Sequence, residues 1–195
     1  GPGHVAESLD RVHPGSVGAC PDLLPVATAR YFSPVATVPA DLKLEPIGGE
    51  PLTMSDQVTM FHLVTVVLDP YTYESAWILE TAGRVLGELV GADCRVAWLV
   101  TADEKDALAF LGPWAERFLT FVDPDRTVVT ALGVEEIPAL VHIGNDLSII
   151  GKADGWDPEQ WRPITDNLAK MMSWSKPLLP KTGDPMPFAG SPVAG

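Results

Sequence analysis

The hydrophobic positions between residues 42 and 175 alternate between two kinds of spacing. The run from Phe61 to Leu68 is apolar almost throughout and rich in β-branched residues, which is typical of a strand buried on both faces of a sheet. The next apolar residues, from Tyr73 to Val90, recur at helical spacing, and Gly91 follows them as a helix-ending residue. The pattern therefore predicts strands and helices in alternation.

The same reasoning places the other elements. A β-hairpin is expected within 42–54, turning at Gly48-Gly49, and strands are expected at 61–68, 94–101, 118–122, 138–143 and 147–152. Helices are expected at 73–90, after Asp103, after Pro113, at 124–132 and from Pro158 onward. This order predicts an α/β fold in which α-helices flank a mixed central β-sheet, with the hairpin at its N-terminal side.

Proline and glycine dominate both ends of the chain. Residues 1–40 are expected to form an irregular, Pro-rich N-terminal arm, and its first residues, GPGH, are typical of a scar left by protease cleavage. Residues 176–195 form a second Pro/Gly-rich extension, which we interpret as a linker or disordered tail in preference to a docking segment. The domain proper is expected at 41–175.

Charge limits the classes of partner. The chain of 195 residues carries 13 Lys and Arg against 26 Asp and Glu, a formal net charge of −13, which repels phosphate backbones and anionic lipid surfaces. We therefore expect no nucleic-acid partner. No apolar run reaches about 18 residues, so no membrane span is expected either. A cytoplasmic location is expected, although the removal of a signal sequence remains open.

One stretch resembles a known family. The order of elements, the hairpin before the core and the segment DPDRTVVTALGVEEIPALVHI (123–143) are similar to the thioredoxin fold, in the branch of TlpA- and ResA-like proteins and peroxiredoxins. The resemblance covers residues 41–175. It places Pro138 at the family's cis-proline, and it implies a cis peptide bond between Ile137 and Pro138.

The resemblance breaks down at the redox motif. Aligning VVLDPYTYESAW with the family's strand, C-x-x-C turn and helix puts Thr72 and Ser75 at the two cysteine positions. The family's buried acidic residue corresponds to Val66. Disulfide exchange needs sulfur at both positions, and a threonine hydroxyl does not ionise at neutral pH as a cysteine thiol does. We therefore expect neither a thiol-disulfide oxidoreductase nor a peroxiredoxin. Thr72 is expected instead to cap the helix that follows, with Glu74 in its first turn.

The remaining polar residues predict no cofactor or metal site. Cys20 and Cys94 form no C-x-x-C pair, and Cys94 is interpreted as a small buried hydrophobic residue at the far end of the sheet. His62 and His142 lie in strands and form no ligand set with the other histidines, so no metal is expected.

Aromatic residues provide the candidate binding positions. Tyr71 and Tyr73 flank Thr72, where the family resemblance implies a groove that holds extended peptide by main-chain hydrogen bonds beside Ile137 and Pro138. Trp156 lies in a loop and is expected at the surface. Four other tryptophans are expected in the core: Trp77, Trp98, Trp114 and Trp161.

Two functions of different class fit these residues. The first is a redox-inactive thioredoxin-like module that binds a protein partner through the former active-site groove, as a chaperone, assembly or scaffold protein, with homo-oligomers formed through the arm or the tail. The second is a thiol-independent enzyme or small-ligand-binding protein that uses Tyr71, Tyr73 and Glu74 near Pro138. An enclosed pocket at these residues would favour the second function, and an open groove the first.

Overall fold

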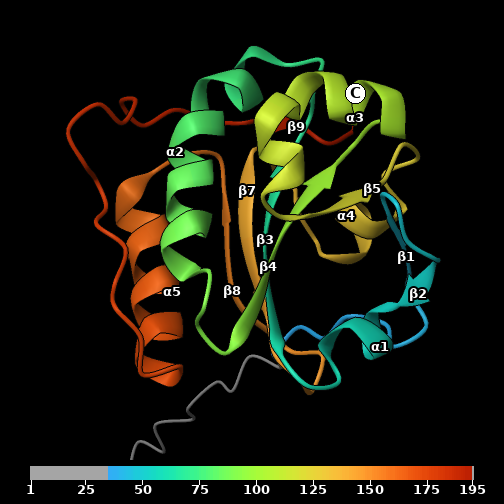
Figure 1. The fold of residues 1–195 in the computed structure, drawn as a ribbon. Coiled ribbons are helices and arrows are strands. Elements are labelled where there is room, and N and C mark those ends of the chain that lie inside the picture. Colours follow the sequence, from blue (N-terminus) through green and yellow to red (C-terminus); the bar gives the residue numbers. More distant parts are fainter. Residues whose placement is uncertain (1–34, 195) are drawn as a thin grey trace, which may run out of the picture. The chain divides into compact units, whose positions relative to one another are not determined.

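The computed structural model describes residues 35–194. Its centre is a mixed sheet with the strand order β2-β1-β5-β4-β3-β7-β8 (Figure 1). The strands are β1 (Lys43–Pro46), β2 (Leu52–Thr53), β3 (His62–Leu68), β4 (Cys94–Val100), β5 (Leu119–Val122), β7 (Ala139–Ile143) and β8 (Ile149–Asp154). The hairpin expected within 42–54 is present as the antiparallel pair β1 and β2. The predicted α/β fold with a mixed central sheet is confirmed.

Helices cover both faces of this sheet. They are α1 (Met54–Val58), α2 (Tyr73–Leu89), α3 (Glu104–Leu111), the 3₁₀-helix η1 (Gly112–Glu116), α4 (Thr127–Ala131) and α5 (Pro158–Met171). Buried residues of α2, α3 and α5 share one hydrophobic cluster, and those of α1 and α4 share the other. Figure 1 shows α2 and α5 on one side of the sheet and α1 and α4 on the other.

Strand β3 explains why its sequence is apolar without alternation. Val66 and Leu68 pack into the cluster under α2, whereas Leu63 and Val67 pack into the cluster under α4. A strand in the middle of a sheet that is covered on both faces buries both of its faces, so nearly every position must be apolar. The continuous run predicted this position correctly.

The carboxyl ends of three parallel strands meet at one edge of the sheet. β3 pairs parallel with β4, and β4 with β5, so Asp69, Thr101 and Asp123 follow neighbouring strands at the same end. Helix α4 begins at Thr127, three residues later than the expected helix at 124–132. Arg126 adopts a left-handed conformation (φ 60°), and the buried carboxylate of Asp123 accepts the backbone N–H groups of Val128 and Val129 at 3.1 and 2.8 Å.

The C-terminal extension is neither a linker nor a disordered tail. The indole Nε1 of Trp174 donates to the Glu88 carbonyl at 2.8 Å, and Leu179 is buried. Further on, β9 (Ser191–Pro192) pairs antiparallel with β6 (Glu136–Ile137). The extension runs up beside α5 and then crosses to this pair (Figure 1). The composition misled the interpretation, because prolines and glycines break regular elements without preventing a segment from packing.

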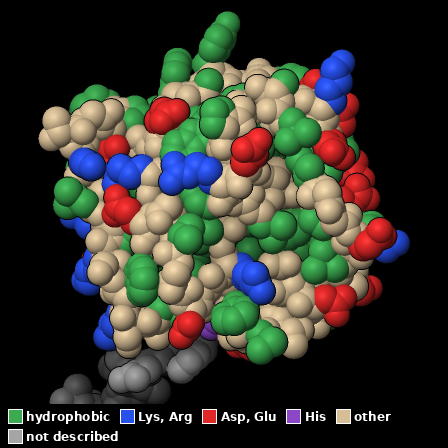
Figure 2. Space-filling model, viewed as in Figure 1, with side chains coloured by type: hydrophobic (Ala, Val, Ile, Leu, Met, Phe, Trp, Pro, Cys, Tyr) green, Lys and Arg blue, Asp and Glu red, His purple; other side chains and the backbone are tan. Residues whose placement is uncertain are grey.

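Hydrophobic, acidic and basic side chains are interspersed on the face that Figure 2 shows. Hydrophobic side chains appear in small separate groups, and acidic side chains gather towards the right-hand edge. Within residues 35–194, no helix is both long and apolar enough to cross a membrane. The N-terminal arm expected at 1–40 lies almost entirely outside the described residues, as does Cys20.

Candidate functional site

The turn between β3 and α2 buries Ser75. Ser75 is fully buried, and its Oγ accepts the backbone N–H of Asp69 at 2.8 Å. Asp69 is itself buried, and its carboxylate accepts the backbone N–H of Tyr71 at 3.0 Å. The Ser75 hydroxyl therefore satisfies a buried backbone donor and is closed off from solvent. It is a structural residue, with no access for a substrate.

Thr72 stands at the N-cap position of α2 but does not cap it with its side chain. Its Oγ1 lies 3.0 Å from the carbonyl oxygen of Asp69 and 3.2 Å from Ser75 Oγ. The hydroxyl thus makes its hydrogen bonds within the turn that precedes α2. The prediction that the Thr72 side chain caps the helix is wrong. Glu74 does lie in the first turn of α2, where its carboxylate interacts favourably with the positive end of the helix dipole.

Sequence reasoning missed an ion pair beside this turn. Nη2 of Arg126 lies 2.9 Å from Oδ2 of Asp69, and the same guanidinium donates to the carbonyl oxygen of Val193. The two partners are 57 residues apart in the chain. A signal existed, because Asp69 directly follows β3 and Arg126 comes soon after β5, and parallel strands bring such residues to the same edge.

The Ile137-Pro138 peptide bond is cis, as expected. The main-chain edge beside it is occupied by the chain's own C-terminal segment. Ile137 pairs with Ser191 and Glu136 with Pro192 in antiparallel register, and the Val193 N–H donates to the Glu135 carbonyl at 2.9 Å. We call this the β6 edge, meaning the backbone of residues 135–137. An extended segment therefore already lies where the family resemblance implied a peptide groove.

Two aromatic residues of α2 form a cluster that meets the C-terminal segment at Phe188, and one of them was not predicted there. The ring of Tyr73 stacks on Trp77 with centroids 6.4 Å apart, and Phe188 meets Trp77 edge to face at 5.5 Å. Tyr73 and Trp77 are 79% and 57% exposed, so the prediction of Trp77 in the core is wrong. Trp77 lies on an outer face of α2, and its ring contacts Phe188 of the C-terminal segment.

Tyr71 faces a different neighbour. Its hydroxyl donates to the carboxylate of Asp106 on α3, and this hydrogen bond raises the pKa of Tyr71 to about 12. A phenol with so high a pKa keeps its proton at neutral pH and is a poor general base. Tyr71 and Tyr73, which the sequence placed in one groove, therefore have different neighbours: Tyr71 contacts α3 and Tyr73 contacts Trp77.

Trp156 is not the surface residue that its loop position indicated. Its side chain is completely buried, it meets Trp161 edge to face at 5.0 Å, and its Nε1 donates to the carbonyl oxygen of Pro185 at 2.9 Å. Its backbone N–H and carbonyl exchange two hydrogen bonds with Phe188, at 3.0 and 2.9 Å. The C-terminal segment covers this loop, and Trp156 therefore lies beneath the segment and contacts it directly. Trp98 and Trp161 are in the core as predicted, and Trp114 is half-buried.

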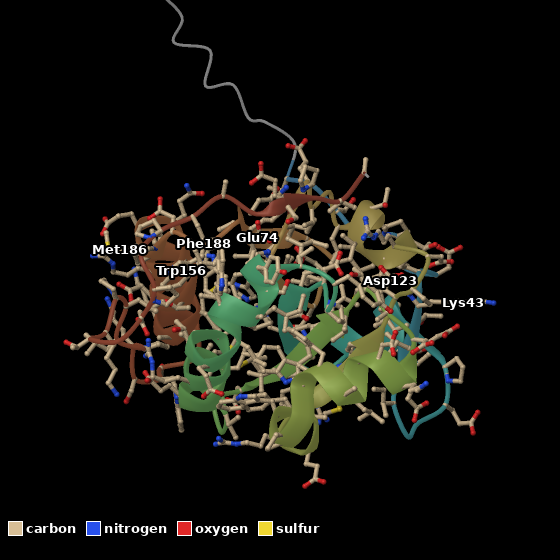
Figure 3. All side chains as sticks on the ribbon, turned by 90° about the horizontal axis from the view of Figure 1, so that it is seen from above. Lys43, Glu74, Asp123, Trp156, Met186 and Phe188 are labelled. Atoms are coloured by element: carbon tan, nitrogen blue, oxygen red, sulfur yellow. The ribbon has the colours of Figure 1, made fainter. Side chains whose placement is uncertain are left out.

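Two hollows lie on different sides of the molecule. One of about 360 Å³ runs beside the C-terminal segment and is lined by Glu136, Asp154, Trp156, Asp157, Gln160, Pro187, Phe188 and Ala189. The other, of about 400 Å³, lies near Lys43 and Asp123. Figure 3 places Trp156 and Phe188 on one side of Glu74, and Asp123 and Lys43 on the other. Neither hollow is lined by Tyr71, Glu74 or Pro138, so neither is the enclosed pocket that would favour a small-molecule site there.

The histidines and the cysteine within residues 35–194 lie away from the turn between β3 and α2. His62 Nδ1 and His142 Nε2 are 2.9 Å apart at the opposite end of β3, and burial lowers the pKa of His142 to about 4. Burial, with a smaller effect of Asp93, raises the pKa of the half-buried Cys94 thiol to about 11. Within residues 35–194, no group of three or more His, Cys, Asp or Glu residues could hold a metal ion.

Comparison with known proteins identifies the fold. No protein-family model and no curated protein matches the chain. Among solved structures, a putative thiol:disulfide interchange protein DsbE from Chlorobium tepidum is 16% identical, with a TM-score of 0.57 over 70% of this chain and 94% of that one. Peroxiredoxin Q from Xanthomonas campestris is also 16% identical, with a TM-score of 0.56 over 71% and 96%.

A third structure is a pneumococcal exposed lipoprotein thioredoxin, Etrx1 from Streptococcus pneumoniae. It is 18% identical, with a TM-score of 0.53 over 67% of this chain and 99% of that one. The chain therefore has a thioredoxin-like fold, and the resemblance stated from the sequence is confirmed at the level of fold. The cytoplasmic location stays a prediction.

Proposed function

We propose that this chain is a protein-binding module that has a thioredoxin-like fold and works without thiol chemistry. One observation carries the proposal: the β6 edge holds an extended segment in antiparallel register. The family resemblance assigns Thr72 and Ser75, neither of which has a thiol, to the positions of the redox cysteines. Addition of an extended peptide to an exposed sheet edge is a general way of binding protein segments, in which main-chain hydrogen bonds supply affinity. The β6 edge can therefore bind an extended peptide, whereas the turn between β3 and α2 lacks the thiols that disulfide exchange requires.

The chemistry of the turn supports the absence of exchange. Ser75 is buried and bonded to a backbone N–H, and Thr72 is bonded within the turn. The one cysteine within residues 35–194, Cys94, begins β4, whereas α2 follows the opposite end of the neighbouring parallel strand β3. A nucleophilic thiolate needs a lowered pKa and access, and Cys94 has a raised pKa and partial burial.

The surroundings of the β6 edge support a protein as the ligand. The exposed rings of Tyr73 and Trp77 continue the surface beside the C-terminal segment, and aromatic residues with large exposed area are common anchors in protein interfaces. Acidic residues such as Asp154 and Asp157 lie beside the same segment, which favours a basic partner. The alternative of a thiol-independent enzyme has less support, because Tyr71 is bonded to Asp106 and does not join Tyr73.

A photo-crosslinking experiment tests the proposal. Benzoylphenylalanine replaces Trp77 in one variant and Leu108, an exposed residue of α3, in the matched control. We expect a discrete protein adduct in source-cell lysate from position 77 and none from position 108. Equal adducts from both positions, or none from 77, would contradict binding at this surface.

An insulin-reduction assay tests the second half of the proposal. The parent chain should show no reductase activity with a dithiol reductant, whereas Thr72→Cys/Ser75→Cys, which restores two thiols at the start of α2, serves as the positive control. Activity of the parent chain equal to that of this variant would show that its thiols perform exchange after all.

A further inference from the structure

The C-terminal segment 185–194 is held to the domain mainly through its backbone. Phe188 exchanges two hydrogen bonds with Trp156, Ser191 pairs with Ile137, and the Val193 N–H donates to Glu135. None of the side chains in this segment is fully buried, and Met186 is 83% exposed. The half-buried side chains of Phe188 and Val193 also pack against the two hydrophobic clusters. Backbone pairing, with some side chains received by pockets, is the way in which a peptide ligand binds by strand addition.

The residues just before this segment are fixed much more firmly. Nη2 of Arg84 lies 3.0 and 2.8 Å from the two carboxylate oxygens of Asp184, and Thr81 Oγ1 donates to the same carboxylate at 3.1 Å. Leu179 is buried against α2 and its neighbours. The segment can therefore leave the β6 edge while Asp184 stays anchored, and it remains tethered close to the edge.

Two positions of the segment show which sequences the edge accepts. A Cβ atom added to Gly190 would lie 2.7 Å from the carbonyl oxygen of Ile137 and 2.9 Å from Glu136 Cβ. Because the nearest obstacle is backbone, it cannot move aside cheaply, and only glycine fits. Two residues earlier, the ring of Phe188 fills the space beside Trp77, with its edge against that ring. Trp77 at Phe188 and the β6 edge at Gly190 together thus select the pattern aromatic-x-Gly.

A competitor must overcome the advantage of the tether, since a short flexible tether gives an effective concentration on the order of millimolar. The hollow beside the segment offers additional binding energy. It is lined by Glu136, Asp154 and Asp157, whereas the segment itself carries no lysine or arginine. A basic residue next to the aromatic one would therefore form ion pairs that the resident segment does not make.

We propose that residues 185–194 are a resident ligand of the β6 edge, and that a partner protein displaces them with an extended segment of the pattern aromatic-x-Gly flanked by Lys or Arg. This inference rests on the proposed function and specifies both its partner and its regulation. The resident segment keeps the edge covered until a better ligand arrives, which also protects a strand edge from unspecific pairing.

Binding of labelled synthetic peptides, followed by fluorescence anisotropy, tests the inference. The full-length Gly190→Val variant should release the segment, and Ala189→Val is the matched control because residue 189 is exposed. The probes are a peptide of residues 184–195 and the same peptide with Met186→Lys and Pro187→Lys, which places the basic residues beside the aromatic one and next to the acidic hollow. We expect Gly190→Val to bind both peptides on the order of tenfold more tightly than the parent chain or Ala189→Val, since the tethered competitor is gone.

The lysine-bearing peptide should bind more tightly than the native peptide to every form of the chain, with a difference that shrinks in high salt. A probe peptide with Gly190→Val should bind none of them. Hydrogen exchange at the amides of Phe188 and Val193 reports whether the segment has left the edge. If Gly190→Val keeps these amides protected, the glycine requirement is wrong and the inference fails. Phe188→Ala offers a second route to release if Gly190→Val does not fold.

The outcomes also separate this inference from the proposed function. Equal binding of the lysine peptide by the parent chain and by a variant whose segment is released would overturn displacement but leave binding at the edge intact. No peptide binding by a variant whose amides exchange freely would overturn both. Formation of a dimer at high protein concentration, with amides protected as in the monomer, would show that a second copy's segment is the occupant and would contradict a basic partner.

Discussion

Arg126 and Asp69 form an ion pair, with Nη2 2.9 Å from Oδ2, between the residue that precedes α4 and the residue that follows β3. The Asp69 side chain is almost fully buried, and the same guanidinium donates to the carbonyl oxygen of Val193. One arginine thus connects the turn before α2 with the C-terminal segment. The backbone of Arg126 lies in the left-handed region (φ 60°), which is costly for a residue with a side chain.

Replacement of this arginine should loosen both of its partners. Arg126→Ala leaves the buried Asp69 carboxylate without its cation, and removes the donor to Val193. Because the Arg126 side chain is about one-third exposed, we expect the free energy of unfolding to fall by about 2 kcal/mol, less than for a fully buried pair. Urea unfolding measures the loss, and hydrogen exchange should show faster exchange at the amide of Val193.

An exposed ion pair supplies the control. Arg162 pairs with Glu159 on the surface of α5, so Arg162→Ala should change the free energy of unfolding by less than about 1 kcal/mol. Similar losses in the two variants would mean that the Arg126 pair contributes no more than a surface contact.

Ser75 and Thr72 should respond differently to removal of their hydroxyls. Ser75→Ala leaves the buried backbone N–H of Asp69 without an acceptor, which should cost about 1–2 kcal/mol. Thr72→Ala removes a hydroxyl that makes no helix cap and is only half-buried, so the loss should stay below about 1 kcal/mol. Thermal unfolding of the two variants under the same conditions decides this, and a larger loss for Thr72→Ala would contradict the structural role assigned to Ser75.

The fold was predictable from sequence because its signals are local. The continuous run at 61–68 and the helical spacing after Tyr73 each specify burial within one element, and burial on both sheet faces follows from them. The short helix α1 was not predicted although Thr53 and Asp56 form a reciprocal capping box, and it begins at Met54, the last residue of the stretch assigned to the hairpin. Five residues give too little periodicity to detect.

The site was less predictable because its contacts join distant segments. Trp156 reads as a surface residue in a loop until residues 185–188 are known to cover it, and Trp77 reads as a core residue until its face of α2 is known. Composition marks the C-terminal segment as irregular, and pairing with Ile137 cannot be read from two residues of strand. The cis bond before Pro138 and the place of Glu74 in the first turn of α2 could be predicted, because each depends on neighbouring residues alone.

The thiol of Cys94 should be slow to react. Burial raises its pKa from 9.0 to about 11, which lowers the thiolate fraction at neutral pH by about a hundredfold. In a Cys20→Ser chain, where Cys94 is the remaining cysteine, we expect reaction with Ellman's reagent on the order of a hundredfold slower than that of a free thiol. The rate should rise to that of a free thiol in urea. A fast reaction of the folded chain would reopen the question of thiol chemistry.

Stability should fall as the pH drops from about 6.5 towards 4, through the histidine pair. Burial lowers the pKa of His142 from 6.5 to about 4, so in this window the unfolded chain takes up a proton that the folded chain refuses. The unfolded state therefore gains stability as the pH falls, by up to about 3 kcal/mol for this residue, and the effect levels off below pH 4. The neighbouring His62 adds to it, because its charge also disfavours protonation of His142.

A variant isolates the contribution of His142. Its Nδ1 is buried without a hydrogen-bond partner, so His142→Leu removes a buried polar ring without leaving a new unpaired group on its own side chain. We expect urea unfolding of His142→Leu to vary less between pH 4 and 6.5 than that of the parent chain. His62→Asn, which keeps the buried imidazole, should retain most of the dependence. If His142→Leu and the parent chain lose stability in parallel over this window, other groups cause the acid sensitivity.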